Sequence, residues 1–71
     1  MSQIKIQEYI ITEVKVNHCA AFKRGQTLKA RDEASKARWT KFLIAHGYSA
    51  TDAEIIYGDA YDMAILELAA V

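Results

Sequence analysis

The chain has 71 residues, of which 52% are hydrophobic and 25% charged, and its 9 basic and 9 acidic side chains give a net charge of zero. This composition excludes an intrinsically disordered chain, which needs fewer apolar residues and a larger net charge. The length excludes a large core, so we expect one small folded domain over residues 1–71. Cys19 is the only cysteine, so no intrachain disulfide can form, whereas a secreted domain of this size usually has several. The sequence has no apolar run as long as the one that a signal peptide or a membrane span requires. It therefore predicts a cytoplasmic protein with no membrane contact.

Residues 3–16 alternate between apolar and polar side chains. Most even positions from 4 to 16 are isoleucine or valine. A period of two is typical of a half-buried strand, and stacked β-branched side chains lose χ1 freedom in a helix. We therefore predict a strand over residues 3–16, with a bend near residues 7–8 or 12 because the segment is long for one strand.

Residues 19–30 contain Gly25 between two short segments that carry apolar side chains. Glycine supplies the positive φ of a tight turn, so this segment predicts a hairpin with strands near 19–23 and 27–30. A short helix over residues 18–24, capped by Gly25, is the alternative, since Ala20 and Ala21 are poor strand formers.

Residues 32–46 have the spacing of a long helix. Asp32 suits its N-cap position, and Gly47 suits the C′ position that follows its end. The side chains at i, i+3, i+4 and i+7 that share one face are Trp39, Phe42, Leu43 and His46. We expect this face to pack on the sheet.

Two shorter helices are predicted in the last third of the chain. Thr51 and Glu54 fit a capping box for a helix over residues 52–57 that ends at Gly58, and Asp59 suits the cap of a last helix over residues 60–70. The predicted fold is therefore α+β: a small N-terminal antiparallel sheet of about three strands, packed by one long helix and two short C-terminal helices.

The sequence contains no pattern typical of a metal, cofactor or catalytic site. His18, Cys19 and His46 are the available soft ligands, and they form neither a CxxC nor an HxxxH spacing. The glycines form no phosphate-binding motif, and a chain this short leaves little room to close a cleft around Asp59 and Asp62. We therefore expect no cofactor, no metal and a function other than catalysis.

Charge is sorted along the chain. Residues 15–41 carry eight basic and two acidic side chains, whereas the residues after Lys41 carry five acidic side chains and no basic one. The five carboxylates belong to Asp52, Glu54, Asp59, Asp62 and Glu67, and Tyr57 and Tyr61 are interspersed among them. We predict that these seven residues bind a protein partner with a basic surface, the carboxylates by attraction and the tyrosines as anchors. The prediction requires that the carboxylates are not neutralised by the lysines and arginines of the same molecule.

The alternative is a nucleic-acid-binding module that uses the basic segment 23–41. Its candidate phosphate contacts are Lys23, Arg24, Lys29, Arg31, Lys36, Arg38 and Lys41. The pI of about 6.7 is far below that of most nucleic-acid-binding domains and disfavours this interpretation. A homodimer closed through the apolar residues 66–71 is a third hypothesis.

In its length, its acidic end and the arrangement predicted for TLKARDEASKARWTKFLIAHG, the chain resembles the small inhibitors that phages and mobile elements encode, anti-CRISPR proteins above all. Several of those proteins bind CRISPR effector complexes, and some present carboxylates where DNA would lie. The resemblance implies an inhibitor whose partner is a CRISPR effector or another nucleic-acid-binding complex. That group shares no motif, so the resemblance assigns a role to no residue.

Overall fold

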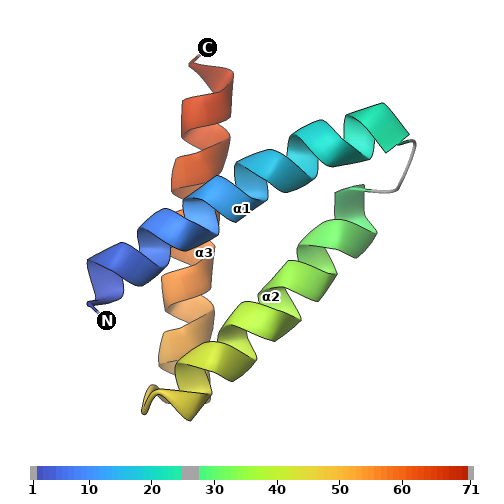
Figure 1. Ribbon diagram of the computed structural model, residues 1–71. Helices are drawn as coiled ribbons and strands as arrows, with labels where there is room; N and C mark the ends of the chain where they lie inside the picture. Colours follow the sequence, from blue (N-terminus) through green and yellow to red (C-terminus); the bar gives the residue numbers. More distant parts are fainter. Residues whose placement is uncertain (1, 25–27, 71) are drawn as a thin grey trace.

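The computed structural model describes residues 2–24 and 28–70, with the side chains of residues 20–24 excepted. It contains helices α1 (Gln3–Arg24), α2 (Leu28–Ala45) and α3 (Ala50–Ala69), shown in Figure 1. None of the described residues lies in a strand. The prediction of an α+β fold with an N-terminal sheet is therefore wrong, and the described part of the chain is all-helical.

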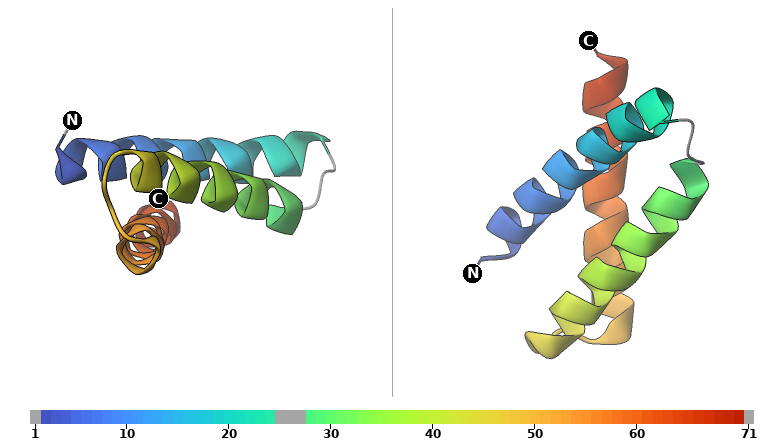
Figure 2. Two further views of the ribbon diagram at one scale, coloured as in Figure 1. Left: turned by 90° about the horizontal axis from the view of Figure 1, so that it is seen from below. Right: turned by 45° about the vertical axis from the view of Figure 1, so that its right-hand side comes forward.

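The three helices form two layers. Helices α1 and α2 lie side by side and antiparallel, and α3 crosses both on one side of this pair (Figures 1 and 2). Each helix contacts the other two. The core at the crossing consists of Ile6, Ile10, Val14, Leu43, Ala53, Ile56, Tyr57, Ala60 and Ala64. Because α3 contributes three fully buried alanines to this core, the backbones of the crossing helices can approach one another closely.

Residues 3–16 are helical because their apolar side chains also fit a helical stripe. Ile6, Ile10 and Val14 follow one another at i, i+4 and i+8, and each is at most 2% exposed, whereas Ile4 is 70% exposed. Burial of such side chains contributes ~1.5–3 kcal/mol each, while β-branching lowers helix propensity by only a few tenths of a kcal/mol per residue. Ser2 caps α1, since its hydroxyl accepts a hydrogen bond from the Lys5 backbone N–H at 3.3 Å. The predicted strand over 3–16 is therefore part of α1.

The segment predicted as a hairpin is also helical where the structure describes it. Residues 19–23 belong to α1, in agreement with the alternative of a helix over 18–24, and α2 begins at Leu28. The turn predicted at Gly25 lies outside the described residues. Asp32 is inside α2 and not at its N-cap.

The end of α2 confirms the prediction for Gly47. Its φ of +98° is the left-handed conformation that favours glycine. The N–H of Tyr48 donates to the carbonyl of Leu43 and the N–H of Gly47 donates to that of Ile44, both at 3.1 Å. These two bonds form a Schellman motif, which satisfies the last carbonyls of α2 and turns the chain toward α3.

The two short C-terminal helices are in fact one. Helix α3 runs from Ala50 to Ala69 through Gly58, which does not end a helix. The N-cap is Ser49 and not Thr51, because the Ser49 hydroxyl accepts a hydrogen bond from the backbone N–H of Asp52 at 3.0 Å. A glycine inside a helix lowers stability by ~1 kcal/mol relative to alanine, and the buried stripe that flanks Gly58 offsets this.

Candidate functional site

The side of α3 that faces away from the core combines carboxylates with exposed apolar side chains. We call this set the α3 outer face; it consists of Asp52, Ile55, Asp59, Asp62, Met63 and Leu66. At 100° per residue, the six side chains fall within roughly 100° of the helix circumference, and the centre of this arc lies ~120° from the centre of the buried stripe. Of the apolar side chains, Ile55 is 55% exposed, Met63 is 51% exposed and Leu66 is 70% exposed. The result is one surface that combines three negative and three apolar groups.

The carboxylates of the α3 outer face are not neutralised within the described part of the molecule. Four ion pairs join described residues, and none of them includes Asp52, Asp59 or Asp62. Helix α3 has no lysine or arginine, so no residue one turn away can pair with them. These three carboxylates therefore meet the condition that the sequence-based hypothesis requires.

The other two acidic residues of the predicted surface lie elsewhere. The Glu67 carboxylate accepts a hydrogen bond from Lys15 of α1, with 2.9 Å between Nζ and Oε1. Glu54 lines a hollow between α2 and α3. Tertiary structure thus divides the five carboxylates among three places: the α3 outer face, the hollow, and an ion pair with α1.

The two predicted tyrosine anchors point toward the other helices. Tyr57 is 5% exposed, and its hydroxyl lies 3.5 Å from the backbone carbonyl of Asp32, to which it donates. Tyr61 is partly buried and donates from its hydroxyl to Oδ2 of Asp32 at 3.0 Å. Burial, with the Asp32 charge adding to it, raises the pKa of Tyr57 to about 12. Burial and the hydrogen bond to Asp32 also raise the pKa of Tyr61. Both phenols therefore remain neutral donors, and neither belongs to the α3 outer face.

Asp32 connects the three helices. Its Oδ2 accepts from Tyr61 of α3 and lies 3.7 Å from Nε2 of His18 on α1. Its Oδ1 is buried and has no hydrogen-bond partner among the described residues. Sequence reasoning treated Asp32 as a cap and missed this role. The spacing contained a signal, since Asp32 precedes Trp39 by seven residues and Leu43 by eleven, which places it on the buried stripe of α2.

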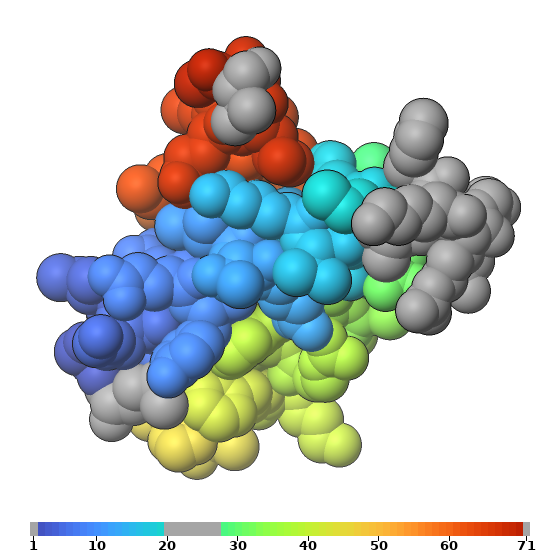
Figure 3. All heavy atoms as spheres, turned by 45° about the horizontal axis from the view of Figure 1, so that its top comes forward, coloured from blue at the N-terminus to red at the C-terminus, as the bar shows by residue number. Residues whose placement is uncertain are grey.

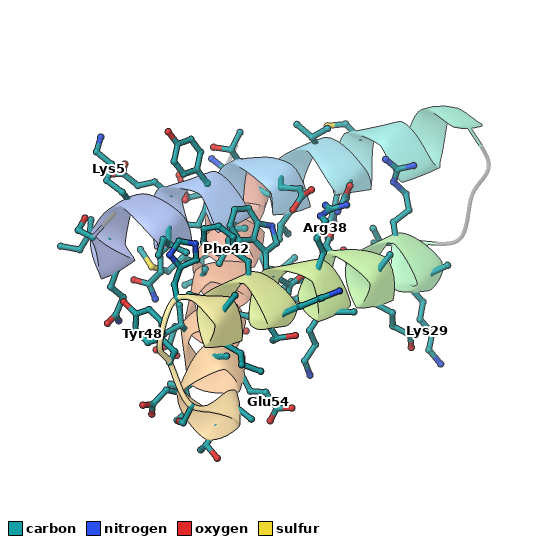
Figure 4. All side chains as sticks on the ribbon, turned by 60° about the horizontal axis from the view of Figure 1, so that its bottom comes forward. Lys5, Lys29, Arg38, Phe42, Tyr48 and Glu54 are labelled. Atoms are coloured by element: carbon teal, nitrogen blue, oxygen red, sulfur yellow. The ribbon has the colours of Figure 1, made fainter. Side chains whose placement is uncertain are left out.

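A second group of polar contacts holds α1 against α2. The Asn17 amide donates to the Ser35 hydroxyl at 2.7 Å, and both side chains are buried. Glu13 of α1 accepts hydrogen bonds from Arg38 and Trp39 of α2, and Figure 4 shows Arg38 pointing from α2 toward α1. These bonds can form in only one alignment of the two helices, so they stabilise the packing of α1 against α2.

A hollow of about 570 Å³ lies between α2 and α3, within the size range of small-ligand sites. Its lining residues are Leu28, Lys29, Asp32, Glu33, Lys36, Glu54, Tyr57, Gly58, Tyr61 and Asp62. None of them comes from α1, and Figure 4 shows Lys29 and Glu54 projecting away from α1. Figure 3 shows the α1 side of the molecule, where α1 lies between the carboxyl-terminal turns of α3 and those of α2. The described lining of the hollow therefore comes from α2 and α3.

The basic side chains that the structure describes within segment 23–41 do not form one patch. The side chains of Lys23 and Arg24 lie outside the described residues. Lys29 and Lys36 border the hollow, whereas Arg38 pairs with Glu13. Lys36 and Arg38 are two residues apart and so point ~200° away from each other around α2. Arg31 has its guanidinium 3.5 Å from the Asn17 amide oxygen, and Lys41 is exposed. This divergence disfavours a single phosphate-binding surface.

The described ranges contain no group of three or more His, Cys, Asp and Glu side chains that suits a metal ion. Cys19 is an exposed free thiol in the carboxyl-terminal part of α1. His46 follows α2 and contacts the ring of Phe42, with 4.3 Å between centroids. Because α1 and α2 are antiparallel, the carboxyl end of α1, which carries Cys19, and the carboxyl end of α2, which His46 follows, lie at opposite ends of the helix pair (Figure 1).

No protein-family model matches the chain, and no curated protein or solved structure matches it at a significant level. Among the described helices, none is both long enough and apolar enough to span a bilayer.

Proposed function

We propose that this protein is a non-enzymatic binding module whose α3 outer face docks on a basic surface of a protein partner, and that it inhibits a nucleic-acid-handling complex of the CRISPR effector kind in this way. One observation carries the proposal: a single helix face combines three carboxylates that form no ion pair with another described residue and three exposed apolar side chains. The carboxylates attract and orient a basic partner, and the apolar side chains provide area that becomes buried on contact.

The spacing of the charges indicates which kind of surface fits. Asp52 and Asp62 are ten residues apart, which is ~15 Å along a helix. One carboxylate per ~5–7 Å is sparser than the phosphates of a DNA strand, which follow at ~3.4 Å of axis. Ile55 lies between Asp52 and Asp59, and Met63 and Leu66 follow Asp62 on the same face. A partner surface that mixes lysines or arginines with apolar groups therefore fits better than a groove that recognises phosphates alone.

Binding of the purified chain to purified CRISPR effector complexes, measured by biolayer interferometry, tests the proposal. We expect binding to at least one effector that weakens as salt concentration rises, because exposed charges are screened. Asp59→Lys should reduce the affinity by about tenfold or more, since a like charge then faces the basic partner.

The matched control is Glu8→Lys, which makes the same change in net charge on α1, where Glu8 is exposed and pairs with Lys5. We expect Glu8→Lys to bind like the parent protein. Equal affinities of Asp59→Lys and the parent would reject the α3 outer face as the docking surface. Absence of binding to every effector type would reject the CRISPR partner.

A further inference from the structure

We propose that the hollow between α2 and α3 binds an arginine side chain presented by a basic peptide segment. This site is separate from the α3 outer face, although Asp62 borders both, and its existence does not depend on the function proposed above. The hollow is an open concavity of about 570 Å³ with aromatic, apolar and charged lining residues. Its shape and charge together select the occupant.

The lining of the hollow favours a cation. Among the described lining residues, four are acidic and two are basic, so negative charges exceed positive ones by two; the six residues are Asp32, Glu33, Glu54, Asp62, Lys29 and Lys36. The charged residues that α3 contributes to the lining are Glu54 and Asp62, and neither takes part in an ion pair among described residues. The buried Oδ1 of Asp32 also has no hydrogen-bond partner there. A cationic group bound beside α3 in the hollow would therefore be attracted by the carboxylates of Glu54, Asp62 and Asp32.

The two tyrosines that line the hollow favour a planar cation over a compact one. The rings of Tyr57 and Tyr61 are stacked, with 6.3 Å between centroids and 29° between planes. A guanidinium group can stack on tyrosine rings and donate to two carboxylate oxygens at once, whereas the ammonium of lysine is a strongly hydrated point charge. Leu28 adds apolar contact for the methylene stem of arginine.

Gly58 keeps the α3 wall open. It lines the hollow in the middle of α3, and a Cβ atom added there would meet no atom within 4 Å. A larger side chain at position 58 would thus occupy the hollow without a clash against the rest of the fold. Gly58→Leu is therefore a blocking variant, and Gly58→Ala is a matched variant that leaves most of the space free and strengthens the helix.

The test is an NMR titration of the full chain with the blocked peptide acetyl-Gly-Arg-Gly-amide, compared with its lysine and citrulline analogues. We expect the arginine peptide to shift the amide signals of the hollow residues saturably at up to about 10 mM, a concentration that nearly saturates a site with a Kd of 1 mM. The lysine analogue should bind at least about threefold more weakly, and citrulline, which is planar but neutral, should not bind.

Variants assign the shifts to the hollow. Gly58→Leu should abolish the saturable shifts, Gly58→Ala should retain them, and Glu54→Gln should weaken binding about two- to fivefold, the range of an exposed ion pair. Asp59→Asn removes a carboxylate of the same helix outside the hollow and should change the affinity by less than about twofold. Unchanged binding by Gly58→Leu, an equal response to the citrulline analogue, or no saturable shift would overturn the proposal. Asp59→Lys disables the α3 outer face alone, so the two proposals fail separately.

Discussion

Truncation of Ile10, compared with truncation of Ile4, tests whether residues 3–16 form a helix. In a strand, both residues would lie on the same face and both would be buried. In α1 they differ sharply, because Ile10 is 0% exposed and Ile4 is 70% exposed. The structure therefore predicts unequal effects of Ile10→Ala and Ile4→Ala on the free energy of unfolding.

The expected magnitudes follow from burial. Replacing isoleucine by alanine removes three carbon atoms, worth ~0.8 kcal/mol each when fully buried, and the cavity adds to this loss. Alanine returns ~0.4 kcal/mol through its better helix propensity. Ile10→Ala should thus destabilise the protein by about 2–4 kcal/mol, a large share of the ~4–10 kcal/mol expected for a domain of this length. At Ile4 the smaller burial and the propensity gain nearly cancel, so Ile4→Ala should stay within about 0.5 kcal/mol of the parent.

Urea denaturation followed by far-ultraviolet circular dichroism measures both values. With a slope of ~1 kcal/mol per molar urea, Ile10→Ala lowers the midpoint by about 2–4 M. If that variant does not fold, Ile10→Val and Ile4→Val form a milder pair, with expected losses of about 0.5–1.5 kcal/mol and about zero. Equal losses at the two positions would refute the helical assignment of this segment.

Two further predictions concern the polar interior. Asn17→Ala and Ser35→Ala should each destabilise the protein by about 1–3 kcal/mol, because the remaining partner of the 2.7 Å hydrogen bond stays buried. A double-mutant cycle measured by urea denaturation should give a coupling energy of about 0.5–1.5 kcal/mol. Additive losses would show that the hydrogen bond contributes nothing to stability. The second prediction concerns Tyr57, whose pKa is raised from 10.0 to about 12 in the folded protein. The unfolded chain therefore loses the phenol proton at a lower pH than the folded protein does. The stability that this shift contributes is present below pH 10 and is lost as the pH rises from about 10 to 12. The loss is at most about 1.4 kcal/mol per pH unit, and Tyr57→Phe should show a shallower alkaline decline in thermal melts; identical declines would contradict the assignment.

The sequence alone determined the features that depend on local chemistry. The sequence shows that residues 32–45 form a helix and that Gly47 ends it in the left-handed conformation. It also shows the sorting of charge into a basic middle and an acidic end. The helix and its end depend on residues within a turn or two of chain, and the charge sorting is a property of composition. The three unpaired carboxylates of the α3 outer face follow in part from the same pattern, because α3 has no basic residue to pair with them.

Tertiary packing decided the rest. The spacing of Ile6, Ile10 and Val14 fits a period of two and a helical stripe equally well, and β-branching favoured the strand. Likewise Gly58 and the neighbouring caps suggested two helices, and nothing near Asp32 in the sequence showed that it would meet His18 and Tyr61. Local preferences amount to tenths of a kcal/mol per residue, whereas burial of one such side chain between crossing helices contributes ~1.5–3 kcal/mol. The contacts that decide these positions join residues far apart in the chain, which is why only the folded molecule reveals them.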